Sequence, residues 1–276
     1  MDAWDSDGRG SFHDINFGVS VNMDFQQRKN PPQWPCIPYN MGLNNGNHDS
    51  MKTLLFLLLL FPMIVMAGND PLPIKTLAGT MDRQVLKQEI ERLETTRGAM
   101  GKAEYRKRIG IAWHNLSALE VDDASGEADK WLGKVFASSP SDYEIMAYYG
   151  SARTMVSRDS WNVLTKMDVA NKGIALIDKA IRKAPDNVIV RMVRANNSLA
   201  LPEFFERRPK VREDFGFLHA RLDKLDISPE TSAEICFKLG RILEEDGERE
   251  KAKALYEQAR TIAPQSSWAE KAAEQR

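Results

Sequence analysis

Apolar residues recur at helical spacing along most of the chain after residue 75. One run comprises Val85, Leu86, Ile90 and Leu93, and a second comprises Tyr105, Ile109, Ala112, Leu116 and Leu119. Spacings of three and four residues place such side chains on one face of a helix. No stretch after residue 75 alternates apolar and polar residues long enough to indicate a strand. The pattern predicts an all-α fold.

Residues 233–266 have the pattern of two antiparallel helices that pack closely together. The positions that define it are Cys236, Leu239, Gly240, Leu243, Ala252, Tyr256, Ala259 and Pro264. Small residues at Gly240 and Ala252 let two helices approach, and the larger side chains fill the space beside them. Gly247 suits a turn that needs a positive φ. Pro264 ends the second helix because it has no N–H group to donate.

The spacing of these residues resembles the tetratricopeptide pattern W-x2-L-G-x2-Y…A-x3-F…P, with Cys236 in place of Trp and Leu243 in place of Tyr. The resemblance implies a right-handed α-solenoid of helical hairpins, because one hairpin cannot bury its apolar face without neighbours. Small and apolar residues recur at similar offsets before Pro185 and Pro140, so we expect about four repeats in residues 103–266, of which 233–266 is the most regular. Residues 68–102 are expected to be a linker and a helix, and residues 267–276 a helix that caps the last repeat.

Two details refine the expected helices. Pro140 and Pro185 are 45 residues apart, which exceeds the period of about 34 residues. The segment Ser157–Met167 is therefore either an insertion or part of an extended helix pair. Candidate capping boxes mark three helix starts, at Ser141, Thr231 and Ser267.

The segment 51–67 has the layout of a signal peptide. Lys52 precedes an apolar run, Leu54–Ala67, that ends in a small residue. This run is shorter than the about 20 residues that a membrane-spanning helix needs. We expect an exported bacterial protein, periplasmic or secreted, whose true start is Met51 and whose residues 1–50 are an over-extended gene model. The alternative is a disordered leader followed by an uncleaved signal anchor in the inner membrane, formed by residues 54–67.

Charge and cysteine content narrow the possible functions. The chain has 38 Lys and Arg residues against 39 Asp and Glu residues. This balance, without a basic stripe interleaved with aromatic residues, gives no electrostatic footprint for nucleic acid. Cys36 lies in the leader, so Cys236 has no cysteine partner in an exported chain and is expected to be a small buried apolar residue.

The sequence contains no motif typical of catalysis. It has no P-loop, no G-x-G-x-x-G and no G-x-S-x-G. His114 and His219, the histidines that follow the signal segment, belong to no cluster with metal-ligand spacing, and His114 is expected to be partly exposed. We therefore expect a protein that is not an enzyme and needs neither cofactor nor metal.

The candidate binding residues come from the expected first helices of the hairpins. The resemblance implies that these helices line a groove that takes an extended peptide or a partner helix. The candidates are Arg191, Arg194, Asn197 and Ser198 on one helix and Tyr148, Tyr149 and Arg153 on another. Spacings of three and four residues align Arg191, Arg194 and Ser198, away from a packed face formed by residues 188, 192, 195 and 199. Arginines in such a groove suit an acidic segment.

Two functions follow from these observations. The leading hypothesis is a non-enzymatic scaffold in the periplasm or cell envelope that binds a protein or peptide. The alternative is an accessory helical-repeat subunit that contacts an envelope enzyme or transporter through its convex or end faces. An arginine-lined or apolar groove favours the first, and an apolar end face favours the second.

Overall fold

The computed structural model describes residues 70–160 and 163–275. All of them belong to the compact unit Leu57–Arg276. The expected leader (1–50) and signal segment (51–67) lie outside the described residues. Within the described ranges, no helix is both long and apolar enough to span a membrane.

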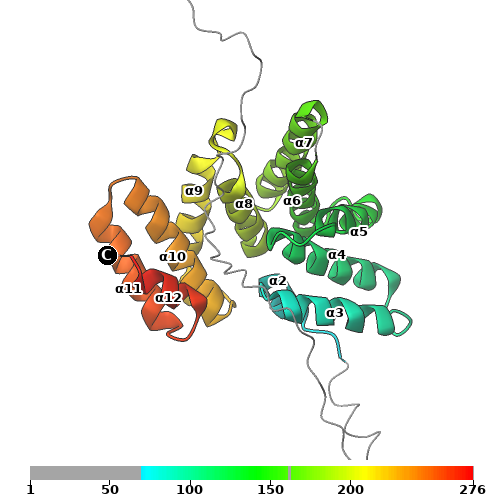
Figure 1. Ribbon diagram of the computed structural model, residues 1–276, viewed down its shortest axis with the longest axis horizontal. Coiled ribbons are helices and arrows are strands. Elements are labelled where there is room, and N and C mark those ends of the chain that lie inside the picture. The colour runs from blue at the N-terminus through cyan, green and yellow to red at the C-terminus, as the bar shows by residue number, and fades with distance from the viewer. Residues whose placement is uncertain (1–69, 161–162, 276) are drawn as a thin grey trace, which may run out of the picture. The chain divides into compact units, whose positions relative to one another are not determined.

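The described chain consists of helices joined by short connections, and the all-α prediction is confirmed because these residues form no strand. Figure 1 shows neighbouring helices following one another in chain order. The α-helices are α2 (Ile74–Gly79), α3 (Arg83–Thr95), α4 (Lys102–Ala118), α5 (Ala124–Ser138), α6 (Tyr143–Asp159), α7 (Val163–Lys183), α8 (Val188–Ala200), α9 (Arg208–His219), α10 (Pro229–Glu245), α11 (Arg249–Ile262) and α12 (Ser267–Ala273). Two 3-10 helices, η2 (Glu203–Phe205) and η3 (Leu222–Lys224), flank α9.

Four helical hairpins make up most of this structure: α4–α5, α6–α7, α8–α9 and α10–α11. The second is the longest because α7 has 21 residues, so the long interval between Pro140 and Pro185 reflects an extended helix pair. Its two helices cross at glycines. A Cβ atom on Gly150 would lie 2.6 Å from the Gly173 carbonyl oxygen, and one on Gly173 would lie 2.5 Å from the Gly150 carbonyl oxygen. The absence of side chains at both positions permits this close approach.

The α10–α11 hairpin contains the residues that define the repeat pattern. Cys236, Ala252, Tyr256 and Ala259 are buried, as are Leu239, Gly240 and Leu243. Gly240 receives the Tyr256 ring, since a Cβ atom there would lie 2.7 Å from Tyr256 Cε1. Gly247 adopts a φ of +83° in the turn, and the exposed Pro264 follows the end of α11.

Two hydrophobic cores meet at α8. Val190 and Val193 of α8 belong to the core of α2–α7, whereas Ala195 belongs to the core of α9–α12. The helix α12 packs on α10 and α11, with the Trp268 ring centroid 5.6 Å from that of Phe237. Helix α8 is therefore covered on more than one side, which decides the environment of its polar residues.

The helix caps differ from the expected capping boxes by one to three residues. Asp142 caps α6 in place of Ser141, and Ser266 caps α12 in place of Ser267. Ser228 caps α10, three residues before Thr231, with Pro229 as the first helical residue. In each case the observed boundary places a side-chain acceptor opposite a free N–H group of the first turn.

Candidate functional site

The two α8 arginines predicted to bind a partner are buried against α9. Arg191 and Arg194 are 8% and 3% exposed. The fully buried Asp214 carboxylate accepts hydrogen bonds from Arg191 Nη1 at 2.7 Å and from Arg194 Nε and Nη2 at 2.6 and 2.7 Å. Glu213 accepts further bonds from both arginines, at 3.3 and 2.8 Å. The chain itself therefore supplies the acidic partner.

The hydrogen bonds of this cluster keep Glu213 and Arg194 charged. Burial raises the pKa of Glu213, but hydrogen bonds from Lys210 and Arg194 outweigh it and hold the pKa at about 2. Burial lowers the pKa of Arg194, and its bonds to Asp214 and Glu213 more than restore it, so that the pKa is raised. A closed network of this kind leaves no free guanidinium for an external carboxylate.

The prediction that Arg191 and Arg194 point into an open groove is therefore wrong. The predicted packed face of α8 is confirmed at Val188, Met192 and Ala195, which pack in the second core, but not at Leu199, which is 43% exposed. Val190 and Val193 are buried in the first core, so α8 is covered on a second side as well. Ser198 is buried as well and accepts a hydrogen bond from Arg207 Nε at 3.4 Å. The pairing with Asp214 could not be read from local spacing, since the two partners lie on different helices.

A chain of buried polar side chains connects α8 with α6 and α4. Asn197 donates to Ser151 Oγ at 3.2 Å and to Thr154 Oγ1 at 2.5 Å. Ser151 Oγ lies 2.9 Å from His114 Nε2, and His114 Nδ1 lies 3.0 Å from Asn115 Oδ1. Asn197, which was expected in the groove, is thus an interior residue.

The protonation of His114 follows from these contacts. Burial lowers the pKa of His114 to about 4, against the opposing effect of its bond to Asn115. The ring is therefore neutral at pH 7, and the Asn115 oxygen requires a donor, so Nδ1 carries the proton and Nε2 accepts from Ser151. The expectation of a partly exposed His114 is wrong, because the side chain is 7% exposed.

The three candidates on α6, Tyr148, Tyr149 and Arg153, lie in two different environments. Tyr148 is buried and meets the His114 ring edge-on at a centroid distance of 4.9 Å. Tyr149 stacks on Phe136 at 5.4 Å and accepts a hydrogen bond from Arg153 at 3.1 Å. The structure does not bring these side chains together with the α8 arginines. Tyr149 and Arg153 are half-buried, and their part in binding stays a prediction.

The structure reveals a different arrangement at the N-terminal side, where α3 and α4 hold the chain's own segment Leu72–Thr80 by its main chain. Glu89 of α3 accepts the Leu72 N–H at 2.9 Å, and Arg108 of α4 donates to the Leu72 carbonyl at 2.5 Å. Asn115 Nδ2 donates to the carbonyls of Leu77 and Thr80 at 2.9 and 3.1 Å, with that of Ala78 at 3.4 Å. We call Glu89, Arg108 and Asn115 the α3–α4 surface, and Leu72–Thr80 the N-terminal segment.

Apolar and charged contacts supplement these bonds. The Leu77 side chain is fully buried in the first core. Lys75 forms an ion pair with Asp226, and a Cβ atom on Gly79 would lie 3.5 Å from Thr231 Oγ1, so the segment also contacts the start of α10. Since the hydrogen bonds go to main-chain groups, they do not depend on the sequence of the bound segment. Sequence analysis missed this site because main-chain acceptors leave no residue pattern.

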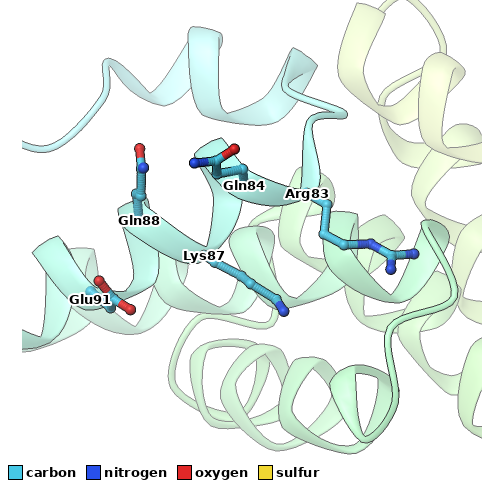
Figure 2. A pocket seen from close by; sticks show the side chains of 5 residues that line it. All are labelled: Arg83, Gln84, Lys87, Gln88 and Glu91. Atoms are coloured by element: carbon cyan, nitrogen blue, oxygen red, sulfur yellow. The ribbon is translucent and has the colours of Figure 1, made fainter. Parts of the chain in front are cut away.

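A shallow hollow of about 510 Å³ lies along α3 and is lined by Arg83, Gln84, Lys87, Gln88 and Glu91. Figure 2 shows these side chains leaving a single helix in different directions, with no common point toward which they converge. Gln88 is exposed and directly precedes the buried Glu89. The hollow therefore marks accessible surface beside the α3–α4 surface. Among the residues that the structure describes, no group of three His, Cys, Asp or Glu side chains is arranged to hold a metal ion.

Comparison with known proteins identifies the fold. Neither a protein-family model nor a curated protein matches the sequence. The crystal structure of TTC0263, a thermophilic TPR protein in Thermus thermophilus, is similar over 68% of this chain and 89% of that chain, with 15% identity and a TM-score of 0.52. The structure of MamA AMB-1 is similar over 69% of this chain and 97% of that chain, with 18% identity and a TM-score of 0.39. The structure of MamA MSR-1 is similar over 68% of this chain and 93% of that chain, with 18% identity and a TM-score of 0.37. The described chain is an all-α helical-repeat solenoid with the tetratricopeptide fold.

Proposed function

We propose that the protein is a non-catalytic scaffold that binds a partner polypeptide at the α3–α4 surface. The observation that carries the proposal is that Arg108 and Asn115 hold a stretch of polypeptide by its main-chain carbonyls. The N-terminal segment is the ligand of this surface within the chain. A partner segment that offers the same carbonyl groups competes for the same donors.

The energetics are compatible with such exchange. A hydrogen bond of this kind contributes about 0.5–1.5 kcal/mol net, and burial of a leucine side chain about 1.5–3 kcal/mol. With the main-chain bonds and the buried Leu77, release of the N-terminal segment costs several kcal/mol. A partner that replaces these contacts and adds others recovers that cost.

Site-specific photo-cross-linking tests the proposal. A photoreactive residue replaces the exposed Gln88, next to the α3–α4 surface, and the matched control carries it at the exposed Lys253 of α11. With extract of the native host, we expect one discrete adduct at position 88, identified by mass spectrometry, and none at position 253. Equal yields at both positions, or no discrete adduct at position 88, would refute the proposed surface.

We also propose that the scaffold acts in the periplasm or outside the cell. Support comes from the sequence layout of residues 51–67, with Lys52 ahead of an apolar run that ends at Ala67. N-terminal sequencing of the protein from its native host should find Gly68 as the first residue. A chain that retains Leu54–Phe61 would instead indicate an inner-membrane anchor.

A second candidate function, an accessory subunit that contacts a larger assembly through an exposed apolar face, is favoured by one observation. Leu199 and Phe204, at the end of α8 and in η2, are 43% and 64% exposed. Replacing both with serine should abolish co-purification with an envelope complex if this face binds, and leave the adduct at position 88 unchanged. An unchanged complex would exclude this face.

A further inference from the structure

A pocket of about 210 Å³ lies where the α3–α4 turn meets α4 and α5. We call it the basic pocket. Four of the residues that line it are cationic and none is acidic; its lining comprises Arg97, Met100, Lys102, Tyr105, Arg106, Trp131 and Lys134. The volume is below the about 300–1,000 Å³ typical of small-molecule sites. It suits one or two side chains of a larger ligand.

The charges in the basic pocket are not compensated. Within the part of the chain that the structure describes, no carboxylate forms an ion pair with Arg97, Lys102, Arg106 or Lys134. Elsewhere, cations as exposed as Lys251 and Lys253 do find a carboxylate, at 2.6 and 3.3 Å. Lys102 also lies in the first turn of α4, where the helix dipole disfavours cations. An anion bound here would relieve both sources of repulsion.

The carboxylates nearest to the pocket do not supply that anion. Glu127 is engaged by Lys130 Nζ at 2.7 Å and by Trp131 Nε1 at 2.9 Å. Glu94 and Glu127 both act electrostatically on the Tyr105 hydroxyl, whose pKa is raised mainly by burial, while Arg97 opposes the shift. Glu94 is exposed and is not part of the pocket lining.

Two aromatic rings hold the cations in place. Tyr105 and Trp131 meet edge-to-face at a centroid distance of 5.6 Å. Arg97 lies over the Tyr105 ring at 5.2 Å, and Lys134 lies over the Trp131 ring at 4.6 Å. Cations therefore already cover the ring faces on which a nucleobase would stack, and the partly exposed Met100 offers an apolar contact in the lining.

From this geometry we infer that the basic pocket binds an acidic peptide segment, with carboxylates on the four cations and an apolar neighbour against Met100. The inference rests on the proposed function in that the ligand is a polypeptide, and it adds a site that shares no residue with the α3–α4 surface. The nearly neutral composition, with 38 basic and 39 acidic residues, gives no electrostatic footprint for nucleic acid. The mixture of carboxylate and apolar contacts favours a peptide over a free phosphate.

Isothermal titration calorimetry with the full chain tests the inference. The probe is acetyl-Glu-Leu-Glu-Phe-Glu-amide, and the neutral control replaces each Glu of the probe with Gln. The test variant carries Lys102→Gln and Lys134→Gln, both at exposed positions, and the matched control carries Lys251→Gln and Lys253→Gln. At low salt we expect the test variant to bind the acidic probe about tenfold more weakly, and the control variant to bind it like the wild type. The affinity should also fall with added salt, since exposed charges are screened over about 10 Å at 0.1 M.

Several results would overturn the inference. The acidic probe could fail to bind at millimolar concentration, the neutral peptide could bind as tightly as the acidic probe, or the two double variants could lose the same affinity for the acidic probe; each of these results contradicts the inference. Tighter binding of tripolyphosphate or of a single-stranded oligouridylate would assign the pocket to phosphate or nucleic acid instead. A specific adduct at position 88 together with any of these results leaves the scaffold function standing and removes only the basic pocket.

Discussion

Replacing Asp214 with asparagine should destabilise the fold strongly, although the two side chains have nearly the same shape. The Asp214 carboxylate is fully buried and accepts three hydrogen bonds at 2.6–2.7 Å from Arg191 and Arg194. Asparagine removes the negative charge and leaves the two buried guanidinium groups with Glu213 and, 4.0 Å from Arg194, Asp178 as their remaining carboxylates. Removal of one member of a buried ion pair costs about 3–5 kcal/mol.

Thermal and urea unfolding, followed by circular dichroism at 222 nm, measures this loss. For a domain of this size, a loss of 3–5 kcal/mol lowers Tm by roughly 6–20 °C. Glu213→Gln is the matched control, since it makes the same chemical change on the neighbouring carboxylate, whose side chain is 43% exposed. We expect it to cost about 1 kcal/mol or less.

A triple variant separates charge from packing. Arg191→Met, Arg194→Met and Asp214→Leu together remove every charge of the buried pair, and a well-packed apolar replacement is often neutral or stabilising. The triple variant should therefore be more stable than Asp214→Asn alone. A loss below about 1 kcal/mol for Asp214→Asn, or equal losses for it and the Glu213 control, would show that the arginines do not depend on this carboxylate.

Three further outcomes are expected. Because burial lowers the pKa of His114 from 6.5 to about 4, the unfolded chain takes up the proton first as the pH falls. Between pH 6.5 and pH 4, the free energy of unfolding should therefore fall by about 3 kcal/mol more in the wild type than in His114→Gln. The same pH dependence of the free energy of unfolding in both proteins, measured by urea unfolding, would contradict this. Gly150→Ala should lower the free energy of unfolding by about 1–3 kcal/mol, since the new Cβ atom would lie 2.6 Å from the Gly173 carbonyl oxygen. Gly126→Ala, whose Cβ atom would have no atom within 4 Å, should not lower it. Equal urea midpoints for the two variants would refute the close crossing. Deleting residues 267–276 should expose Phe237 and cause self-association in light scattering, and a monomer of unchanged stability would show that α12 is dispensable.

The features predicted correctly from sequence depend on local chemistry. Helical periodicity defined the all-α fold, and Gly247 has the positive φ that its turn requires. Helix boundaries were less certain, because Ser141 and Asp142 are both good caps and only the geometry of the first turn selects Asp142.

The binding residues were not predictable in the same way. Whether Arg191 faces solvent or a carboxylate depends on how α9 packs against α8, and Asp214 lies 23 residues away in the sequence. Asn115 recognises main-chain carbonyls, which every residue carries. The basic pocket emerges only when cations from the α3–α4 turn, α4 and α5 are seen together.

An engineered disulfide gives the most direct test of whether a partner and the N-terminal segment share the α3–α4 surface. Gly79→Cys and Thr231→Cys place two thiols at a suitable separation, since a Cβ atom on Gly79 would lie 3.5 Å from Thr231 Oγ1. The bond locks the end of the N-terminal segment to α10, and the photoreactive residue at position 88 reports partner binding. If the surface is shared, the adduct yield falls in the oxidised protein and returns on reduction, while protein without the two new cysteines shows no redox dependence. The same yield in the oxidised and reduced states would contradict a shared surface.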